Sequence, residues 1–215
     1  MTMNRRDFLR MSAALTAAGM SPSLFAATKE QFTIYGAPAM PSVTIAVAAA
    51  QGKLAKQADV ALEIWRSPDQ LRAGVASGQF KVMMSPSNVG VNLRNQGQQV
   101  GMVNILTNGI TQLMCKGSTI TSPQELVGKK ILVPFKNYMP DIVLQALLKK
   151  LNIDINKVDI TYAATPTEAI GLFLLKDFHA AILPEPMASA VVQKAKIVGT
   201  EIVRGFDLVK EWGQA

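Results

Sequence analysis

The chain has 215 residues, 49% of them hydrophobic, which suffices for one large or two small domains with buried cores. The formal net charge of +7 is spread along the chain without a Lys/Arg block interleaved with aromatic residues, so the sequence argues against a nucleic-acid partner. Cys115 is the only cysteine, which excludes an internal disulfide and a cysteine-rich metal site.

The first 26 residues have the features of an export signal. The segment Asn4-Arg5-Arg6-Asp7-Phe8-Leu9-Arg10 resembles the twin-arginine motif, in which paired arginines precede Phe-Leu. A weakly apolar segment, residues 11–20, follows and is too short for a permanent membrane span, and small residues then allow cleavage after Ala26. An ordinary amphipathic helix is the alternative. We expect residues 1–26 to be a twin-arginine-type export signal and the rest of the chain to reach the periplasm.

The first half of the body alternates apolar strands with helices that begin at Ser or Pro. Ser42 is predicted to cap one helix, and Ser67-Pro68-Asp69 to start the next with Ser at the cap and Pro in the first turn. Residues 110–116 are expected to run on as a connection between two lobes. The predicted strands are residues 31–35, 60–65, 81–84 and 100–106, and the predicted helices are residues 43–51, 67–78 and 85–94.

The second half repeats this alternation, and its clearest unit is a strand, a loop and a helix within residues 130–153. Ile131 to Val133 is a buried strand, two prolines bracket a polar loop, and Pro140 starts a helix whose positive end carries the Asp141 carboxylate. The other predicted strands are residues 158–163, 180–183 and 199–203, and the other helices are residues 122–125, 165–175, 187–194 and 206–212.

Strands that alternate with helices through short loops predict an α/β fold with mostly parallel sheets. We expect two lobes, residues 27–113 and residues 114–215, with the loops at the strand ends facing each other across a ligand cleft.

Four segments of the body resemble a known family. They are Thr33-Ile34-Tyr35-Gly36-Ala37-Pro38, Met84-Ser85-Pro86-Ser87, the run from Ser122 to Ile131, and Ala181-Ile182-Leu183-Pro184-Glu185-Pro186-Met187-Ala188. From about Phe32 onward the chain resembles the periplasmic solute-binding proteins of ABC importers for nitrate, sulfonate, taurine and thiamine precursors, the NMT1/THI5-like family.

The resemblance implies a type II-like periplasmic binding fold that captures a small-molecule solute and delivers it to an ABC permease in the inner membrane. No cofactor is predicted, the lone His179 and Cys115 argue against a metal site, and a monomer is expected. Chains of this family normally return to complete the first lobe, whereas this sequence stops at Ala215. The first lobe is therefore expected to be incomplete, either in a truncated chain or in a compact variant.

The candidate ligand-binding residues lie in the strand-end loops, where helix N-termini offer free N–H groups. The serines could instead cap a helix, Tyr138 could be a surface turn residue, and Glu185 could contact a permease arginine or cap the following helix. The candidates are Gly36, Ala37, Pro38, Ser85, Pro86, Ser87, Asn108 and Gly109 in the first lobe, and Asn137, Tyr138 and Glu185 in the second.

Two other functions remain open from the sequence. One is an enzyme of the thiamine-pyrimidine synthase type, which the single Cys115 and the single His179, far apart in the chain, argue against. The other is a ligand-sensing module for a membrane receptor. No catalytic residue is predicted, and the solute is expected to be a sulfonate- or nitrate-like anion or a thiamine-pyrimidine-like heterocycle.

Overall fold

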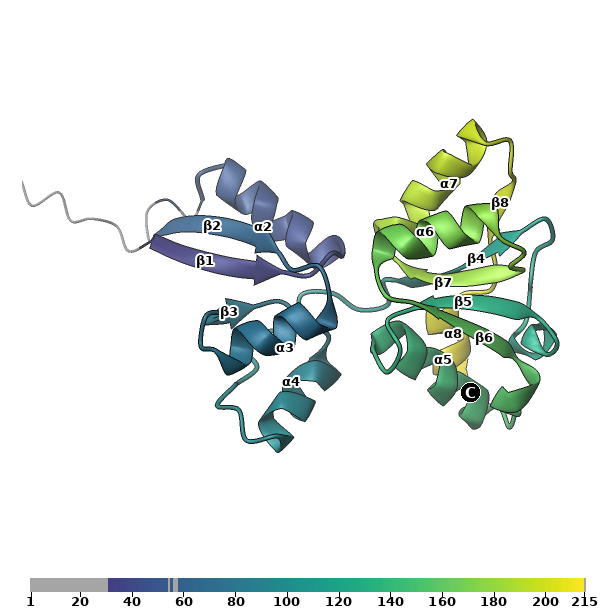
Figure 1. Cartoon of the computed structure of the whole chain (residues 1–215), viewed down its shortest axis with the longest axis horizontal. Helices are drawn as coiled ribbons and strands as arrows, with labels where there is room; N and C mark the ends of the chain where they lie inside the picture. The colour runs from purple at the N-terminus through teal and green to yellow at the C-terminus, as the bar shows by residue number, and fades with distance from the viewer. Residues whose placement is uncertain (1–30, 54, 56–57, 215) are drawn as a thin grey trace, which may run out of the picture.

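The computed structural model describes residues 31–53, 55 and 58–214, so the predicted export signal at residues 1–26 lies outside the described residues. The described chain forms two α/β lobes, joined by residues 96–110 (Figure 1). Within these ranges, no helix combines the length and the apolar character that a bilayer crossing needs.

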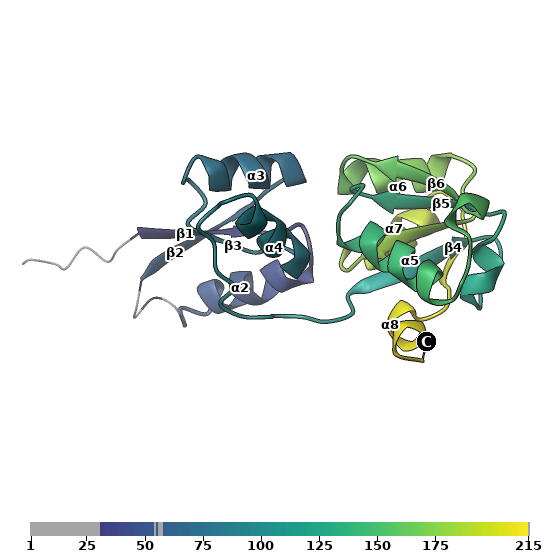
Figure 2. The same cartoon turned by 90° about the horizontal axis from the view of Figure 1, so that it is seen from below.

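The first lobe contains a three-stranded sheet in the order β2-β1-β3, with every pair parallel. The helix α2 lies on one side of this sheet and α3 on the other (Figure 2). Its elements are β1 (Gln31–Gly36), α2 (Met40–Ala50), β2 (Asp59–Ile64), α3 (Pro68–Ala76), β3 (Val82–Met83) and α4 (Ser87–Asn95).

The second lobe contains a five-stranded sheet in the order β6-β5-β7-β4-β8. Strand β5 is parallel to β6 and β7, whereas β4 is antiparallel to both of its neighbours. The elements are β4 (Thr111–Lys116), a 3-10 turn η1 (Pro123–Leu126), β5 (Lys130–Pro134), α5 (Met139–Lys150), a 3-10 turn η2 (Ile155–Lys157), β6 (Asp159–Ala163), α6 (Pro166–Leu175), β7 (Ala180–Pro184), α7 (Met187–Ile197), β8 (Ile202–Arg204) and α8 (Leu208–Gln214).

Two apolar cores cover the two faces of the second sheet, and this is why strand β5 is continuously apolar. Ile131 and Val133 pack with α5 and α8 on one face, while Leu132 packs with α6 and α7 on the other. All three side chains are fully buried. Alternate residues of a buried strand point to opposite faces, so both faces require apolar side chains. The predicted α/β fold with mostly parallel sheets is confirmed.

Two of the predicted elements are wrong, and they concern neighbouring segments. Residues 100–106, predicted as a strand, pair with neither sheet and belong to the connection between the lobes. Residues 111–116, predicted to lie in that connection, form β4, which lies between β7 and β8 in the second sheet. The predicted boundary at 113/114 between the lobes falls inside this strand and stays a prediction.

The helix starts show which capping predictions hold. Ser67 caps α3, because its hydroxyl accepts a hydrogen bond of 3.2 Å from the Gln70 N–H. Pro140 occupies the first turn of α5, as predicted. Ser42 does not cap α2, since this helix already begins at Met40. The Ser42 hydroxyl instead donates to the Ala37 carbonyl at 2.6 Å and fixes the loop after β1.

Candidate functional site

The two lobes meet at the loops that follow their parallel strands. The Met40 N–H, at the start of α2, donates a hydrogen bond of 2.9 Å to the Glu185 carbonyl, after β7. The Glu185 N–H in turn donates to the carbonyl of Ile110 at 2.9 Å, where the connection enters the second lobe. We call this region, where the loops after β1, β2 and β3 face those after β5 and β7, the interlobe junction.

Aromatic side chains from both lobes pack together at the interlobe junction. Tyr138, at the start of α5, is only 4% exposed and belongs to the same buried cluster as Trp65 and Ala37 of the first lobe. Its ring meets the Trp65 ring edge-on, with 6.2 Å between the ring centroids, and the Phe135 ring at 5.7 Å. The Trp65 indole N–H donates to the Met84 carbonyl at 2.9 Å, which holds the ring against the loop after β3.

Three polar side-chain atoms are buried without a hydrogen-bond partner among the described residues. They are the Tyr138 hydroxyl and both amide atoms of Asn88, in the first turn of α4. Burial raises the pKa of the Tyr138 hydroxyl, while the Arg72 guanidinium acts in the opposite direction. Buried side-chain polar atoms nearly always have a partner, so each exception calls for an explanation. Asn88 was missed from the sequence, because an Asn at a helix start reads equally well as a solvated turn residue.

The start of α4 also presents free hydroxyls. The predicted alternative, in which Ser85 or Ser87 caps this helix, is not observed: Pro86 is the N-cap residue and no side chain caps the helix. Within the described residues, neither serine hydroxyl makes a hydrogen bond. Ser85 and Pro86 are half-buried and Ser87 is exposed.

A buried carboxylate organises the loop that carries Tyr138. Asp141 is fully buried and accepts hydrogen bonds from the Asn137 N–H at 2.7 Å and the Gln145 amide at 2.8 Å. Both Phe135 and Asn137 have φ of 61°, a left-handed backbone conformation that residues other than glycine rarely adopt. Such conformations persist only where the surroundings fix them, and the Asp141 carboxylate does so here. Asn137 itself is exposed.

Glu185 uses both of its carboxylate oxygens within the second lobe. One accepts from the Arg204 guanidinium at 2.6 Å and the other from the Ser189 N–H, in the first turn of α7, at 3.1 Å. Burial raises the pKa of the Glu185 carboxyl, but these hydrogen bonds outweigh it and leave the pKa below its ordinary value. The bond from Ser189 is the helix-cap contact that the sequence offered as one alternative.

The remaining predicted site residues lie at two different places. Gly36 and Ala37 are buried and Pro38 half-buried at the end of β1, beside the junction. Asn108 and Gly109 are exposed in the connection between the lobes, and Gly109 faces Val209 of α8. The structure therefore groups the loop after β1 with Tyr138 in one cluster, but does not bring Asn108 or Gly109 into it.

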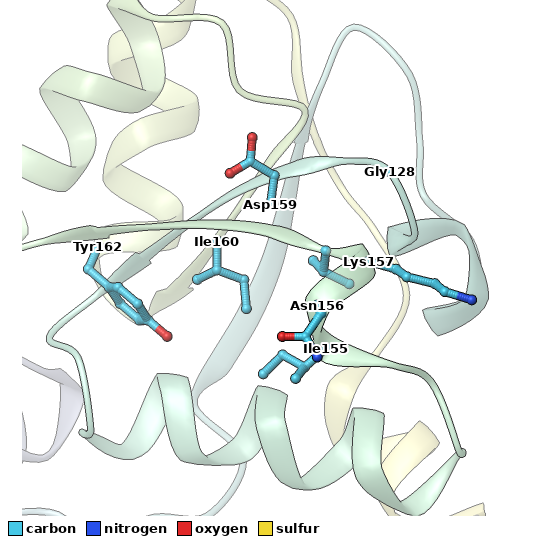
Figure 3. A pocket seen from close by; sticks show the side chains of 8 residues that line it. Gly128, Ile155, Asn156, Lys157, Asp159, Ile160 and Tyr162 are labelled. Atoms are coloured by element: carbon cyan, nitrogen blue, oxygen red, sulfur yellow. The ribbon is translucent and has the colours of Figure 1, made fainter.

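A surface hollow lies elsewhere, along β6 and η2 in the second lobe. It measures about 580 Å³, and in Figure 3 Ile155, Ile160 and Tyr162 point from it toward α5 while Lys157 points away. It is widely open to solvent and contains no orphaned buried atom, so we assign the candidate site to the interlobe junction. No group of three or more His, Cys, Asp or Glu side chains that could hold a metal occurs in the described part of the chain.

Two family models match the sequence. The model of the twin-arginine translocation pathway signal sequence covers residues 2–22, which makes the chain an exported, periplasmic protein. The model described as NMT1/THI5 like covers residues 40–173, and so spans both lobes. No curated protein matches the chain.

Solved structures of periplasmic binding proteins share the fold. The chain aligns with the aliphatic sulphonate binding protein SsuA from Escherichia coli at a TM-score of 0.63 and 15% identity, covering 81% of this chain and 59% of that one. The alkanesulfonate-binding protein SsuA from Xanthomonas axonopodis pv. citri, bound to MOPS, aligns at 0.60 and 18%, covering 84% and 62%. A ligand-binding component of an ABC-type import system from Staphylococcus aureus aligns at 0.64 and 14%, covering 82% and 60%.

These identities show the fold alone: a type II-like periplasmic binding protein with two α/β lobes. The chain spans about three fifths of the length of these relatives.

Proposed function

Because the chain belongs to the NMT1/THI5-like family, we propose that it is the solute-binding component of an ABC import system. It captures a small solute between its two lobes and delivers it to a permease in the inner membrane. The single observation that carries this proposal is the set of buried, unpaired polar atoms of Tyr138, where the lobes meet, and of Asn88, in the first turn of α4 after β3.

The energetics of these atoms favour a bound polar solute. Leaving a buried donor or acceptor without a partner costs about 1–3 kcal/mol per group. The Asn88 amide offers both donors and an acceptor, and the Tyr138 hydroxyl offers one of each. A solute with polar atoms would satisfy both side chains and recover this cost only when both lobes surround it. Binding is then coupled to lobe closure, as in other two-lobed binding proteins.

The charges near the junction favour an anion. The N-terminus of α4 carries a positive partial charge, and the free hydroxyls of Ser85 and Ser87 can donate to an oxyanion. Glu185, the acidic candidate, is neutralised by Arg204 at 2.6 Å and therefore repels an anion less than its sequence position implied. We propose a small organic or inorganic oxyanion such as a sulfonate or nitrate as the solute, and the sulfonate-binding proteins among the similar structures suggest where to begin a screen.

In this proposal the protein binds its solute without chemical change. The single histidine and the single cysteine of the chain are both engaged away from the junction. The His179 ring accepts from the Lys130 N–H at 3.1 Å, and the Cys115 thiol is fully buried in the core of the second lobe. Burial raises the pKa of that thiol, which disfavours the reactive thiolate.

Titration calorimetry on the mature protein, residues 27–215, tests the proposal with alkanesulfonates, nitrate and a pyrimidine. We expect an anion to bind, and Asn88→Ala and Tyr138→Phe each to weaken its affinity about 10-fold or more, the effect of a lost hydrogen bond to a charged group. Asn92→Ala is the matched control, because Asn92 is exposed one turn further along α4.

Binding of the pyrimidine alone would replace the anion by a heterocycle. Unchanged affinity in both junction variants would remove the site, and no binding by any compound would count against the function.

A further inference from the structure

Arg72, on α3 of the first lobe, acts through its charge on the unpaired hydroxyl of Tyr138 in the second lobe. Burial raises the pKa of this hydroxyl, and the Arg72 guanidinium opposes the rise because its positive charge stabilises negative charge on the phenol oxygen. The field of Arg72 at the Tyr138 oxygen therefore attracts anions. Since that oxygen has no hydrogen-bond partner among the described residues, a solute that bonds to it lies in the same field.

The fold brings Arg72 to the side of the first lobe that faces the second. Strand β2 points toward the second lobe in Figure 1, and the Trp65 ring, directly after β2, meets the Tyr138 ring. Helix α3 begins at Pro68, and Arg72 lies in its second turn. The preceding residue, Leu71, is fully buried in the cluster that contains Trp65 and Tyr138. Successive helical residues are about 100° apart, so Arg72 flanks this buried face.

The Arg72 guanidinium is engaged by a carboxylate of its own helix. One of its nitrogens lies 2.6 Å from a carboxylate oxygen of Asp69, three residues earlier. The Arg72 side chain is 51% exposed and that of Asp69 88%, and exposed ion pairs of this kind are weak. A carboxylate presents two oxygens to a guanidinium, as a sulfonate or nitrate does. Asp69 therefore holds a group that is suited to an oxyanion, and holds it loosely enough to be displaced.

We propose that Arg72 sets the charge specificity of the interlobe junction by binding the oxyanion of the solute, and that Asp69 competes with the solute for the guanidinium. The inference rests on the proposed function and deepens it. The guanidinium presents its N–H donors in a planar fork that matches two oxygens of one oxyanion. A sulfonate or nitrate then bonds to Arg72 from the first lobe and to the Tyr138 hydroxyl from the second. A neutral heterocycle gains nothing from this charge.

Titration calorimetry of ethanesulfonate and nitrate on the mature protein, residues 27–215, tests the role of Arg72. We expect Arg72→Gln to weaken binding about 10- to 100-fold, the effect of losing hydrogen bonds to a charged group. Arg72→Lys keeps the charge without the fork and should bind with intermediate affinity. Arg94→Gln is the matched control, because it removes the same charge from an exposed side chain in the last turn of α4, and it should leave the affinity nearly unchanged.

Competition by Asp69 predicts an effect of the opposite sign. Asp69→Asn frees the guanidinium, so the affinity for the anion should rise about 2- to 5-fold, in keeping with the strength of an exposed pair. The gain should disappear when Arg72 is already replaced by Gln, which a double-mutant cycle measures. Asp59→Asn, at the opposite end of β2 from Trp65, is the control for the loss of an acidic charge. All the substituted side chains are exposed, so the variants are expected to fold.

The same titrations distinguish a failure of Arg72 from a failure of the proposed function. If an anion binds the wild type and Tyr138→Phe weakens it, while Arg72→Gln binds as tightly as Arg94→Gln, the role of Arg72 is overturned and the proposed function stands. An equal gain from Asp69→Asn in the Arg72→Gln background would overturn the competition. If neither anion binds the wild type, both the inference and the proposed function are overturned.

Discussion

The hydroxyl of Tyr162, on the edge strand β6, donates a hydrogen bond of 3.0 Å to the buried carboxylate of Asp141, at the start of α5. The same carboxylate accepts from the N–H of Asn137. One side chain thus ties the sheet edge, the helix and the loop that carries Tyr138 into a single unit. The position of Tyr138 at the interlobe junction depends on a group that does not itself reach the junction.

Asp141→Asn tests this arrangement. The amide has one oxygen in place of two charged ones, so a buried donor loses its partner, and we expect the free energy of unfolding to fall by about 1–3 kcal/mol. Urea denaturation measures it. Asp69→Asn, at an 88% exposed side chain in the first turn of α3, is the control and should change stability by less than about 1 kcal/mol. Equal stabilities of the two variants would show that Asp141 does not hold the loop.

Tyr162 makes the stability of the folded protein depend on pH in the alkaline range. Burial and the hydrogen bond to Asp141 raise the pKa of Tyr162 from 10.0 to about 12. The folded state then keeps a proton that the unfolded state loses. The contribution of Tyr162 to the free energy of unfolding is therefore complete below pH 10 and declines as the pH rises toward 12. We expect the urea midpoint of the wild type to fall more steeply between pH 9 and pH 12 than that of Tyr162→Phe. Parallel profiles would contradict the raised pKa.

The unpaired hydroxyl of Tyr138 predicts an opposition between stability and binding. Tyr138→Phe removes a buried polar atom that has no partner among the described residues, so the solute-free protein should become more stable by about 1 kcal/mol. Tyr162→Phe should have the opposite effect at neutral pH, because it removes a hydrogen bond. Thermal unfolding without and with solute measures the stability of each variant relative to the wild type. A Tyr138→Phe variant that is less stable than the wild type would mean that its hydroxyl is already satisfied.

The contrast between residues 100–106 and 111–116 shows what the sequence could not determine. Both segments are apolar and suit a strand, and local propensity alone predicts the first at least as strongly. Whether an extended segment joins a sheet depends on partners that are distant in the chain: residues 111–116 pair with β7 and β8, from residues 180–204, whereas residues 100–106 find none. The outcome is decided by tertiary pairing.

Local signals were reliable where a few adjacent residues settle the structure. Ser67 with Pro68, and Thr165 with Glu168, cap helices through contacts within three residues, and both helices begin where predicted. Tyr138 could be named as a candidate because it stands at a helix start after a strand. Asn88 could not, because an Asn at a helix start reads equally well as a solvated turn residue, and the burial of its amide atoms is a tertiary property.

The ion pair of Glu185 and Arg204 predicts a sensitivity to acid. Because the pKa of Glu185 is lowered in the folded state, its carboxylate takes up a proton more readily in the unfolded state as the pH falls. The contribution of the ion pair to stability is therefore present above pH 4.5 and is lost as the pH falls below it. Arg204→Met should lower stability at pH 7 by about 1 kcal/mol or less, because the Arg204 side chain is half-exposed, and should flatten the decline in acid. Arg72→Met removes an exposed pair with Asp69 and serves as the control. Chemical denaturation at pH 7 and below pH 4.5 compares the stabilities of the two variants. If Arg204→Met lost stability in acid as steeply as the wild type, the pairing would be contradicted.

Two helical glycines give a matched test of packing in the first lobe. Gly74 lies inside α3 and Gly90 inside α4, and both helices have nine residues. A methyl group at Gly74 would come within 2.5 Å of the Phe80 ring, whereas one at Gly90 would meet nothing within 4 Å. The Phe80 ring cannot easily retreat, since it stacks on Tyr35 with 3.7 Å between the ring centroids, and the Phe80 backbone N–H donates to the Gly74 carbonyl at 2.9 Å.

We therefore expect opposite signs from the same substitution. Gly90→Ala should raise the free energy of unfolding by about 0.5–1 kcal/mol, because alanine loses less backbone entropy in a helix. Gly74→Ala should lower it by about 1–3 kcal/mol, because the methyl group overpacks the core. Urea denaturation of the two variants decides the matter. If both were stabilising, the contact between α3 and Phe80 would be looser than described, and the support it gives to Tyr35, at the end of β1 beside the junction, would be lost with it.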